Sequence, residues 1–439
     1  MLGFERRVAI TGLGLVTPLG RSPDTIWAAI SEGRGMVRRL GAFQVAGLPN
    51  DIGAEISDFD LKKYSLSRYW NALRKTKKYL ARDIQLAVAA AQLAVEDSRL
   101  AEGKVDPTRI GIDLGAGLIS SELDELAPAI GKAYETGSGK AFDFPTWGRE
   151  SIEMIEPIWL LKYLPNMLAC HISILIDCQG PSNTITEADA SSNLAIAEAA
   201  RVIARGKADV MITGGADSKI HPLSLVRMAL FDTMSRWTGE PSQACRPFDR
   251  RRDGWVPGEG AGIVILEEWS HAQKRGATIL GEVLGGGSGC DAMPRRGLDP
   301  DGGGTEVAIQ AALEEAGIAP AAVGHVNAHG AANRVSDLAE ARAFERIFGA
   351  KGVPVTALKG YMGNLASGCG AVDMMVSLIG VNRGKVPPIL NCDELDPEMA
   401  LDVVVGEPRP TNNPIFVTTN LTPIGQAAAL VIRGFPKET

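Results

Sequence analysis

Three polar side chains stand where short apolar segments end, which is where an α/β protein would place a reactive site. Asp189 precedes the helical pattern NLAIAEAARVIARG, His329 follows the apolar segment VNA, and Lys359 follows VTAL. Ligands of α/β proteins bind at the carboxyl ends of strands. A turn from strand to helix points its side chain into a pocket, and the helix N–H groups there favour negative charge. A cysteine at such a turn would be a nucleophile, whereas an aspartate is favoured as an anion.

Each of these residues also has a structural interpretation. Asp189 could cap the helix that follows it, because Asp is common at that position. A lone histidine such as His329 is more often structural, although His-Gly after a buried strand favours a site. Lys359 is the only charged residue in its segment. A buried lysine needs a partner, so we expect an ion pair that holds the site together, with a catalytic role second.

The elements that must position these residues repeat along the chain. Apolar strand patterns and helical patterns alternate, which predicts crossover βαβ units and a sheet covered on both faces. The order in residues 6–268 returns in residues 279–434. We therefore expect a duplicated α/β fold, with one half at residues 1–268 and the other at residues 269–439. The polar segment WSHAQKRGAT lies at this boundary.

The glycine-rich segments do not complete a nucleotide-binding motif. Gly12-Leu13-Gly14 follows a strand pattern but lacks the third glycine of a dinucleotide fingerprint. We therefore predict a tight turn there, and turns at the glycines of residues 285–287 and 302–304. A dinucleotide-dependent dehydrogenase is the least supported enzyme class.

The amino-acid composition argues against several further classes of protein. The chain has 439 residues and a net charge of −7, which argues against a general nucleic-acid binder. Its six cysteines have neither CxxC nor zinc-ligand spacing, so we expect no metal and no disulfide framework. The sequence holds no apolar run near the ~20 residues that cross a bilayer. We expect a cytoplasmic protein without a membrane span, a cofactor or a nucleic-acid partner.

Six segments resemble one protein family, and they occur in the family's order over nearly the whole chain. They are RRVAITGLGLVTPLG, NMLACHISILIDCQGPS, AARVIARGKADVMITGGAD, CRPFDRRRDGWVPGEGAGIVILEE, VNAHG and PVTALKGYMGNL. They are similar to elongating β-ketoacyl-acyl-carrier-protein synthases of type II fatty-acid and polyketide systems. The resemblance implies a thiolase fold in a five-layer αβαβα arrangement, a dimer, and an acyl carrier protein as partner.

The resemblance also implies a changed active site. Counting from AARVIARGKADV, the family's nucleophilic cysteine falls on Asp189, and its second histidine falls on Asn364. The first histidine and the lysine are retained as His329 and Lys359. A carboxylate is a weak acyl acceptor, and its negative charge would oppose an oxyanion. Asn364 can donate a hydrogen bond but cannot exchange protons as histidine does.

The family's gating loop and its threonines after His-Gly are changed as well. The loop becomes Leu421-Thr-Pro-Ile-Gly-Gln, so Leu421, Pro423 and Gly425 are the expected gate residues. The two threonines become Ala331 and Asn333.

A basic segment is the candidate docking site for the acidic carrier protein. It contains Arg74, Lys75, Lys77 and Lys78, and the resemblance adds Arg201. The alternative is a solvated charged face.

Three functions remain open. The first is a non-condensing subunit similar to the chain-length factors, which lack the cysteine and pair with an active ketosynthase; a homodimer is the other assembly. The second is changed chemistry, with Asp189 and His329 hydrolysing or decarboxylating acyl thioesters. Relatives that decarboxylate keep both histidines, which Asn364 does not match. The third is an ordinary 3-oxoacyl-acyl-carrier-protein synthase.

Overall fold

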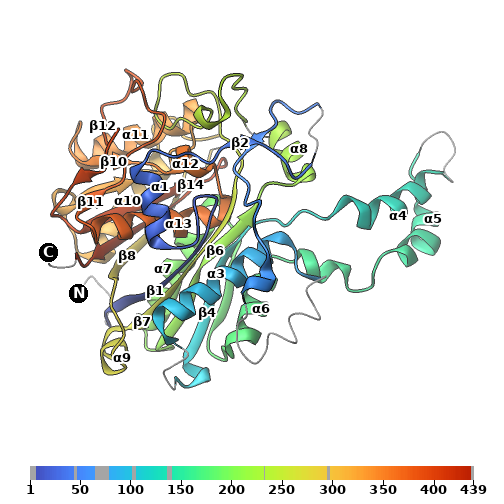
Figure 1. Cartoon of the computed structure of the whole chain (residues 1–439), viewed down its shortest axis with the longest axis horizontal. Coiled ribbons are helices and arrows are strands. Elements are labelled where there is room, and N and C mark those ends of the chain that lie inside the picture. Colours follow the sequence, from blue (N-terminus) through green and yellow to red (C-terminus); the bar gives the residue numbers. More distant parts are fainter. Residues whose placement is uncertain are drawn as a thin grey trace.

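The computed structural model describes residues 6–43, 47–64, 79–100, 105–135, 141–231, 233–293 and 297–436. Its centre is a sheet of eleven strands in the order β12-β10-β9-β14-β15-β8-β1-β7-β6-β4-β5. Two pairs of short strands, β2 with β3 and β11 with β13, form separate ribbons. Figure 1 shows the sheet inside the body of the molecule, with one long projection on its side.

The first half of the sheet comes from residues 8–268. Its strands are β1 (Val8–Val16), β4 (Ile110–Ala116), β5 (Ser182–Ile185), β6 (Val210–Ser218) and β7 (Glu259–Glu268), with the ribbon strands β2 (Arg38–Arg39) and β3 (Ile52–Gly53). Its helices are α1 (Pro23–Ser31), α3 (Arg82–Ser98), α4 (Leu123–Glu135), α5 (Phe144–Thr146), α6 (Met167–Ile176), α7 (Ser191–Ala204) and α8 (Pro222–Phe231).

The second half follows the helix α9 (Trp269–Lys274). Its strands are β8 (Gly281–Cys290), β9 (His325–Asn327), β10 (Pro354–Thr356), β12 (Asp402–Val403), β14 (Ile415–Leu421) and β15 (Gln426–Gly434), with the ribbon strands β11 (Lys385–Val386) and β13 (Arg409–Pro410). Its helices are α10 (Gly303–Ala316), α11 (Arg334–Phe348), α12 (Lys359–Met362) and α13 (Cys369–Val381).

The two halves have the same topology. From the centre outward, β1-β7-β6-β4-β5 in one half corresponds to β8-β15-β14-β9-β10 in the other. The sense of each pair agrees: β1–β7 and β8–β15 are antiparallel, while β6–β4 and β14–β9 are parallel. β1 also pairs with β8 in antiparallel sense and joins the halves. The predicted duplicated α/β fold is confirmed, and the division between residues 268 and 269 remains a proposal.

Five layers result from the helices. α7 and α13 lie between the halves, because each contacts strands of both. All thirteen residues of α13 are buried. α3 and α6 cover the outer face of the first half, and α10 and α11 cover that of the second. The central helices place their amino ends at one edge of the sheet, next to the carboxyl ends of the parallel strands.

The predicted turn at Gly12 and Gly14 is wrong, because both glycines lie inside β1. α3 crosses β1 so closely that a Cβ on Gly14 would overlap the Ala90 carbonyl, and one on Gly12 would overlap that of Ala94. The glycines of residues 285–287 likewise lie inside β8, where Gly285 and Gly287 face α10 and Gly286 faces Ala197 of α7. Both sets permit close packing of a helix on a strand, as glycine does where two backbones approach.

His325 at the start of β9 makes the fold sensitive to acid. Its ring is fully buried against Phe416, and neither ring nitrogen has a hydrogen-bond partner among the described residues. Burial lowers the pKa of His325 to about 3. An unfolded histidine titrates near ~6.5, so the unfolded chain binds a proton between these values that the native protein excludes.

We therefore expect stability to fall as pH decreases below about 6.5. Between pH 8 and pH 5, the free energy of unfolding should fall by about 2 kcal/mol less in His325→Leu than in the native chain. Urea unfolding at both pH values checks this. His271→Leu, which leaves His325 in place, is the control, and equal pH dependence in His325→Leu and the native chain would contradict the assignment.

Candidate functional site

Asp189 lies on a sharp turn between β5 and α7. It is the middle residue of a short 3-10 turn, Ala188–Ala190, and the preceding Ala188 has a φ of 42°. The backbone therefore makes a sharp turn at Ala188–Ala190, called the elbow below, which directs the Asp189 side chain into the protein. The capping interpretation is wrong, because α7 begins at Ser191 and the Asp189 carboxylate accepts no bond from its amides.

The environment of Asp189 disfavours its anion. The side chain is buried, and its Oδ1 has no hydrogen-bond partner among the described residues. Burial raises the pKa of Asp189, and the Lys359 ammonium and the Asn364 amide oppose that shift without cancelling it. The expected stabilisation of the carboxylate by the helix amides is therefore outweighed by desolvation.

His329 follows β9, and its ring orientation is fixed. Its backbone N–H donates to Glu340 Oε1 at 2.7 Å, and the amide nitrogen of Asn420 lies 3.3 Å from Nδ1. The Asn420 oxygen already accepts from Asn193, so its nitrogen is the group that donates to Nδ1. The ring proton is then on Nε2. Burial and the Lys359 charge lower the pKa of His329, which keeps the imidazole neutral.

Lys359 is a structural cation behind the site. Its Nζ donates to the His329 carbonyl oxygen at 2.6 Å and lies 3.4 Å from Asp373 Oδ2. The expected ion pair is confirmed, and the lysine does not line the cavity. Asp373 raises the pKa of Lys359 against the effect of burial. The lysine therefore acts through the position of His329.

Asn364 is held in one orientation. Its Oδ1 accepts from the Ala366 backbone N–H at 2.8 Å and from the Cys369 thiol at 3.0 Å. With the oxygen occupied, the amide nitrogen is the group that hydrogen-bonds the Asp189 carboxyl. Cys369 is buried, its pKa is raised by burial, and it does not line the cavity. It holds the Asn364 side chain in place.

These residues share one cavity of about 1020 Å³. Asp189, His329 and Asn364 line it together, as do Ala331 and Asn333. Lys219, just after β6, also lines it and escaped the sequence analysis. The sequence feature that could have identified Lys219 is the one used for Lys359: it is a lysine directly after an apolar strand. Trp255, Leu298 and Met228 add apolar surface to the wall.

The expected gate is a turn between β14 and β15. Leu421 and Pro423 line the cavity, whereas Gly425 does not. Gly425 has a φ of 87°, its N–H donates to the Thr422 oxygen at 3.0 Å, and its oxygen accepts from Asp291. Gly425 therefore shapes the turn that presents the other two residues.

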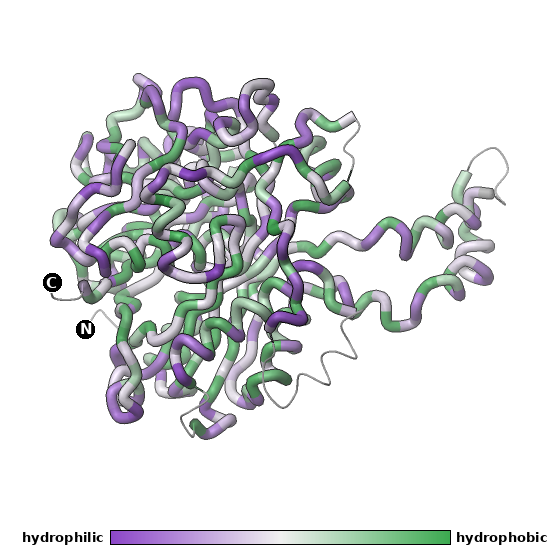
Figure 2. Tube along the Cα trace, viewed as in Figure 1, coloured by the Kyte–Doolittle hydropathy of each residue, from purple (hydrophilic) through white to green (hydrophobic). Residues whose placement is uncertain are grey.

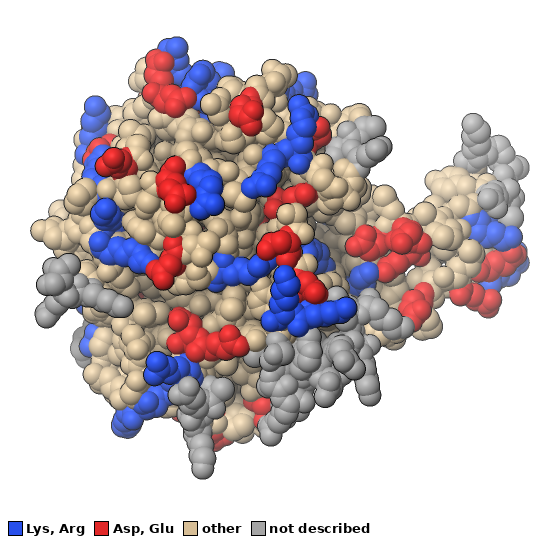
Figure 3. All heavy atoms as spheres, in the orientation of Figure 1, with Lys and Arg blue, Asp and Glu red and all other residues tan. Residues whose placement is uncertain are grey.

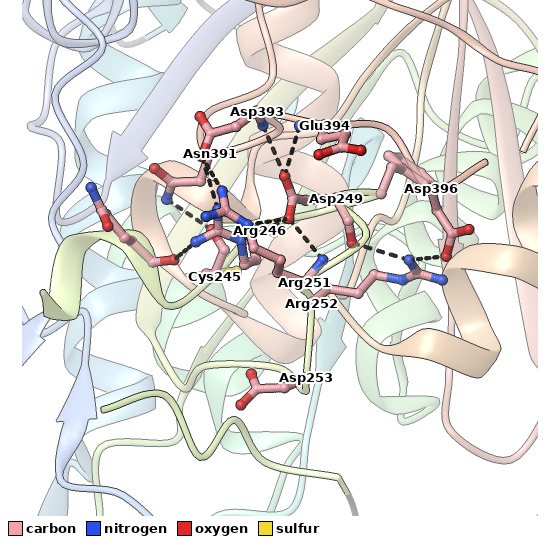
Figure 4. Close-up of polar contacts among 12 residues, drawn as sticks. Cys245, Arg246, Asp249, Arg251, Arg252, Asp253, Asn391, Asp393, Glu394 and Asp396 are labelled. Atoms are coloured by element: carbon pink, nitrogen blue, oxygen red, sulfur yellow. Dashed lines mark hydrogen bonds and ion pairs between the residues drawn. The ribbon is translucent and has the colours of Figure 1, made fainter. Parts of the chain in front are cut away.

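A buried charge network lies next to the cavity (Figure 4). The Asp249 carboxylate accepts from the backbone N–H groups of Arg251, Asp393 and Glu394 at 2.8–3.0 Å and from the Arg246 side chain. Arg252 pairs with Asp396 at 2.6 Å and lies 3.6 Å from Asp337. The network fixes the segment that leads to Trp255, which lines the cavity.

Two domain models and several relatives match the chain. The N-terminal domain model of the β-ketoacyl synthases matches residues 5–272, and their C-terminal domain model matches residues 280–393. The chain belongs to the β-ketoacyl synthase family. It is 34% identical to 3-oxoacyl-acyl-carrier-protein synthase 2 of Coxiella burnetii over 407 residues, which are 92% of this chain and 93% of that protein. The corresponding protein of Synechocystis is 32% identical over 407 residues, which are 92% of this chain and 92% of that protein.

Solved structures agree with this membership. A β-ketoacyl synthase from Burkholderia phymatum is 31% identical and superposes with a TM-score of 0.85, covering 98% of this chain and 100% of that one. The ishigamide ketosynthase/chain length factor is 25% identical with a TM-score of 0.84, covering 98% and 99%. The thiolase fold of the β-ketoacyl synthases is thereby established for this chain.

The candidate carrier-docking residues of this β-ketoacyl synthase family member fall into two groups. Arg74, Lys75, Lys77 and Lys78 lie outside the described residues. Arg201 on α7 pairs with Glu315 at 2.8 Å and donates to the Gly286 oxygen. On the face in Figure 3, Lys and Arg are interspersed with Asp and Glu. In the described part of the chain, no helix is long and apolar enough to cross a membrane.

Proposed function

We propose that this β-ketoacyl synthase family member is a non-condensing subunit, similar to a chain-length factor, that binds acyl chains and acyl carrier protein. The observation that carries the proposal is Asp189 on the elbow, where the family resemblance places the nucleophilic cysteine. No cysteine lines the described cavity. An acyl-aspartate would be a mixed anhydride, which water hydrolyses readily.

The remaining groups support binding better than condensation. His329 and Asn364 both present N–H groups to the cavity, so they can hold a carbonyl oxygen. Neither the neutral Asn364 nor the depressed pKa of His329 suits proton exchange near neutrality. The cavity of about 1020 Å³ has room for an acyl chain, and apolar side chains line part of it.

Two exposed surfaces support a dimer. β5 is the last strand of the sheet, and its outer edge pairs with no strand of the described chain. The projection that carries α4 and α5 extends from the body (Figure 1) and has many apolar segments (Figure 2). Exposed large apolar side chains occur here and in neighbouring helices: Leu118, Leu123, Ile130, Tyr134, Phe144, Ile152, Met154, Ile158, Leu160, Leu161, Ile174, Leu230 and Phe231.

Such a surface is unusually apolar for a monomer. We infer that it contacts a second ketosynthase-like chain, either an active ketosynthase or another copy of this chain. The acyl carrier protein is the second proposed partner, because relatives that match over almost their whole length are named acyl-carrier-protein synthases. A cytoplasmic location fits these partners.

Co-expression with an active ketosynthase tests the assembly. We expect one-to-one heterodimers by size exclusion and native mass spectrometry, and a change in product chain length when this chain is present. Phe144→Asp together with Leu160→Asp should weaken the heterodimer, because each charge would be buried in the interface. Lys207→Asp, a matched change at an exposed residue on a polar face, should leave the heterodimer intact. Homodimers alone with every ketosynthase tried would contradict the pairing.

Decarboxylation of a carrier-bound malonyl group is the second candidate, and one observation favours it. Burial raises the pKa of Asp189, which weakens the opposition of its charge to an enolate that His329 and Asn364 would stabilise. Acetyl-carrier protein formed by the native chain, and lost in His329→Ala, would establish this activity. Hydrolysis by an Asp189–His329 pair has less support, since no hydrogen bond joins these side chains among the described residues.

A further inference from the structure

The exposed apolar surface of the projection is also acidic. In residues 118–134 and 141–166, the described acidic side chains outnumber the basic ones. The acidic side chains are those of Glu122, Asp124, Glu125, Asp143, Glu150, Glu153 and Glu156, and the basic ones are those of Lys132, Arg149 and Lys162. Figure 3 shows several Asp and Glu side chains along the projection. This surface therefore carries surplus negative charge.

The two lysines of the projection already have carboxylate partners within it. Lys132 lies 3.5 Å from Glu150, and Lys162 lies 2.7 Å from Glu125. The exposed residue Asp124 takes part in no ion pair of the described chain, and the same is true of Glu153. The surplus is therefore not neutralised by the projection itself.

A hollow of about 370 Å³ lies between α4 and the segment that follows α5. Three carboxyl groups and several apolar side chains line it, among them Asp124, Glu125, Glu156, Pro128, Met154 and Trp159. A lysine or arginine side chain combines an apolar stem with a cationic head. The lining of the hollow matches both parts of such a side chain.

A buried carboxyl group behind the open edge of the sheet also lacks a counter-ion in the described chain. Asp113 on β4 lies opposite Asn183 of β5 and is 1% exposed. Its Oδ1 has no hydrogen-bond partner among the described residues. Burial, and then the charge of Glu198 on α7, raise the pKa of Asp113 to about 7. A second acidic surface placed against this edge would add to the unfavourable effect of Glu198.

A dimer of two copies would place this acidic surface against itself. A two-fold dimer uses the same patch of both subunits, so the two surpluses of negative charge would face each other. Like charges brought together in an interface oppose binding. An acidic carrier protein would meet the same repulsion, so neither of these two occupants fits the surface.

We propose that this surface pairs with a ketosynthase-like chain whose facing surface is basic, and that its acidic side chains select against a dimer of two copies of this chain. This inference rests on the proposed pairing and decides between its two partners. Lysine or arginine side chains of the partner would enter the hollow, with their stems against Met154 and Trp159 and their cations at the carboxylates of α4.

Sedimentation equilibrium of the full chain alone tests the self-repulsion. Salt screens exposed charges, so the dissociation constant of the homodimer should fall about tenfold or more between about 0.05 M and about 0.5 M NaCl. The heterodimer with an active ketosynthase should respond in the opposite direction, because salt screens attraction there.

Asp124→Lys together with Glu153→Lys should remove the difference. At low salt, this variant should form the homodimer about tenfold more tightly and the heterodimer about tenfold more weakly than the native chain. Neither residue has a described ion pair to lose, so the fold should be retained. Glu314→Lys together with Glu345→Lys is the matched control, since it makes the same change in net charge at exposed residues of α10 and α11.

The results distinguish this inference from the proposed pairing. A homodimer that weakens as salt rises, or that Asp124→Lys with Glu153→Lys does not tighten, would overturn the selection by charge and leave pairing with a ketosynthase intact. Equal tightening in the control variant would also overturn it, because the effect would then come from net charge alone. Absence of a heterodimer with every ketosynthase, at both salt concentrations, would overturn the proposed pairing itself.

Discussion

Asp189→Cys is expected to make the chain accept an acyl group without making it a synthase. The elbow is already built, with the strained Ala188 at a φ of 42° and α7 beginning at Ser191. A thiol here lies at a helix amino end with Lys359 nearby, and both oppose the rise in thiol pKa that burial causes. Intact mass after incubation with an acyl carrier protein charged with an acyl group should show one acyl group per chain, and none in the native protein.

Elongation needs a further change. Asn364→His added to Asp189→Cys should raise condensation by about a hundredfold or more over Asp189→Cys alone, the usual contribution of a positioned acid–base group. Asp189→Ser is the control for the elbow, and Cys290→Ser removes an exposed thiol that could react non-specifically. An acyl adduct on the native chain, or full condensation by Asp189→Cys alone, would show that the account of this site is wrong.

Asp249→Ala is expected to cause the largest loss of stability among single substitutions in the charge network. The carboxylate is fully buried and accepts from three backbone N–H groups and Arg246 (Figure 4). Its removal leaves the three backbone donors without this acceptor and the buried Arg246 guanidinium with one carboxylate, that of Asp393, which costs about 3–5 kcal/mol. Urea unfolding measures the change.

The matched control is Asp402→Ala. Asp402 pairs with Arg409 near the surface, where an ion pair contributes about 1 kcal/mol or less. Asp249→Asn keeps the shape and should lose less than Asp249→Ala. Equal losses for Asp249→Ala and Asp402→Ala would contradict the structural role of the network.

The sequence predicted the fold through the order of its elements, which the two matching half-sheets confirm. It failed where tertiary packing decides the local structure. The pattern at Gly12 and Gly14 looked like a turn, but these glycines stay in a strand because α3 packs against their bare backbone. Asp189 looked like a helix cap, but the helix begins two residues later and the side chain points into the cavity.

The candidate site could be predicted in part. Asp189, His329 and Asn364 were identified from the motifs, and the structure brings them to one cavity. Their supporting residues were missed. Asn420 lies far along the chain from His329, and Cys369, although close to Asn364 in sequence, belongs to no motif on which the prediction rested. The state of Asp189 was also misjudged, because desolvation depends on the whole cavity and cannot be read from one helix end.

The proposed function depends on Asp189 standing where the family resemblance places the nucleophilic cysteine. The chain has the elbow, the cavity and the Lys359 cation behind His329, and the side chain on the elbow is a carboxyl group. The donors that remain favour binding and polarisation of an acyl group over its covalent capture. Lys219 also lines this cavity, and its ammonium pairs with the buried Asp217 carboxylate.

The central claim is that this chain does not condense acyl groups by itself. The most direct measurement incubates the purified chain with acyl carrier proteins carrying malonyl and acyl groups, and follows both protein and carrier by intact mass. The account predicts an unmodified chain and no elongated carrier-bound product. An acyl-enzyme or a β-ketoacyl product elongated by two carbons would contradict it.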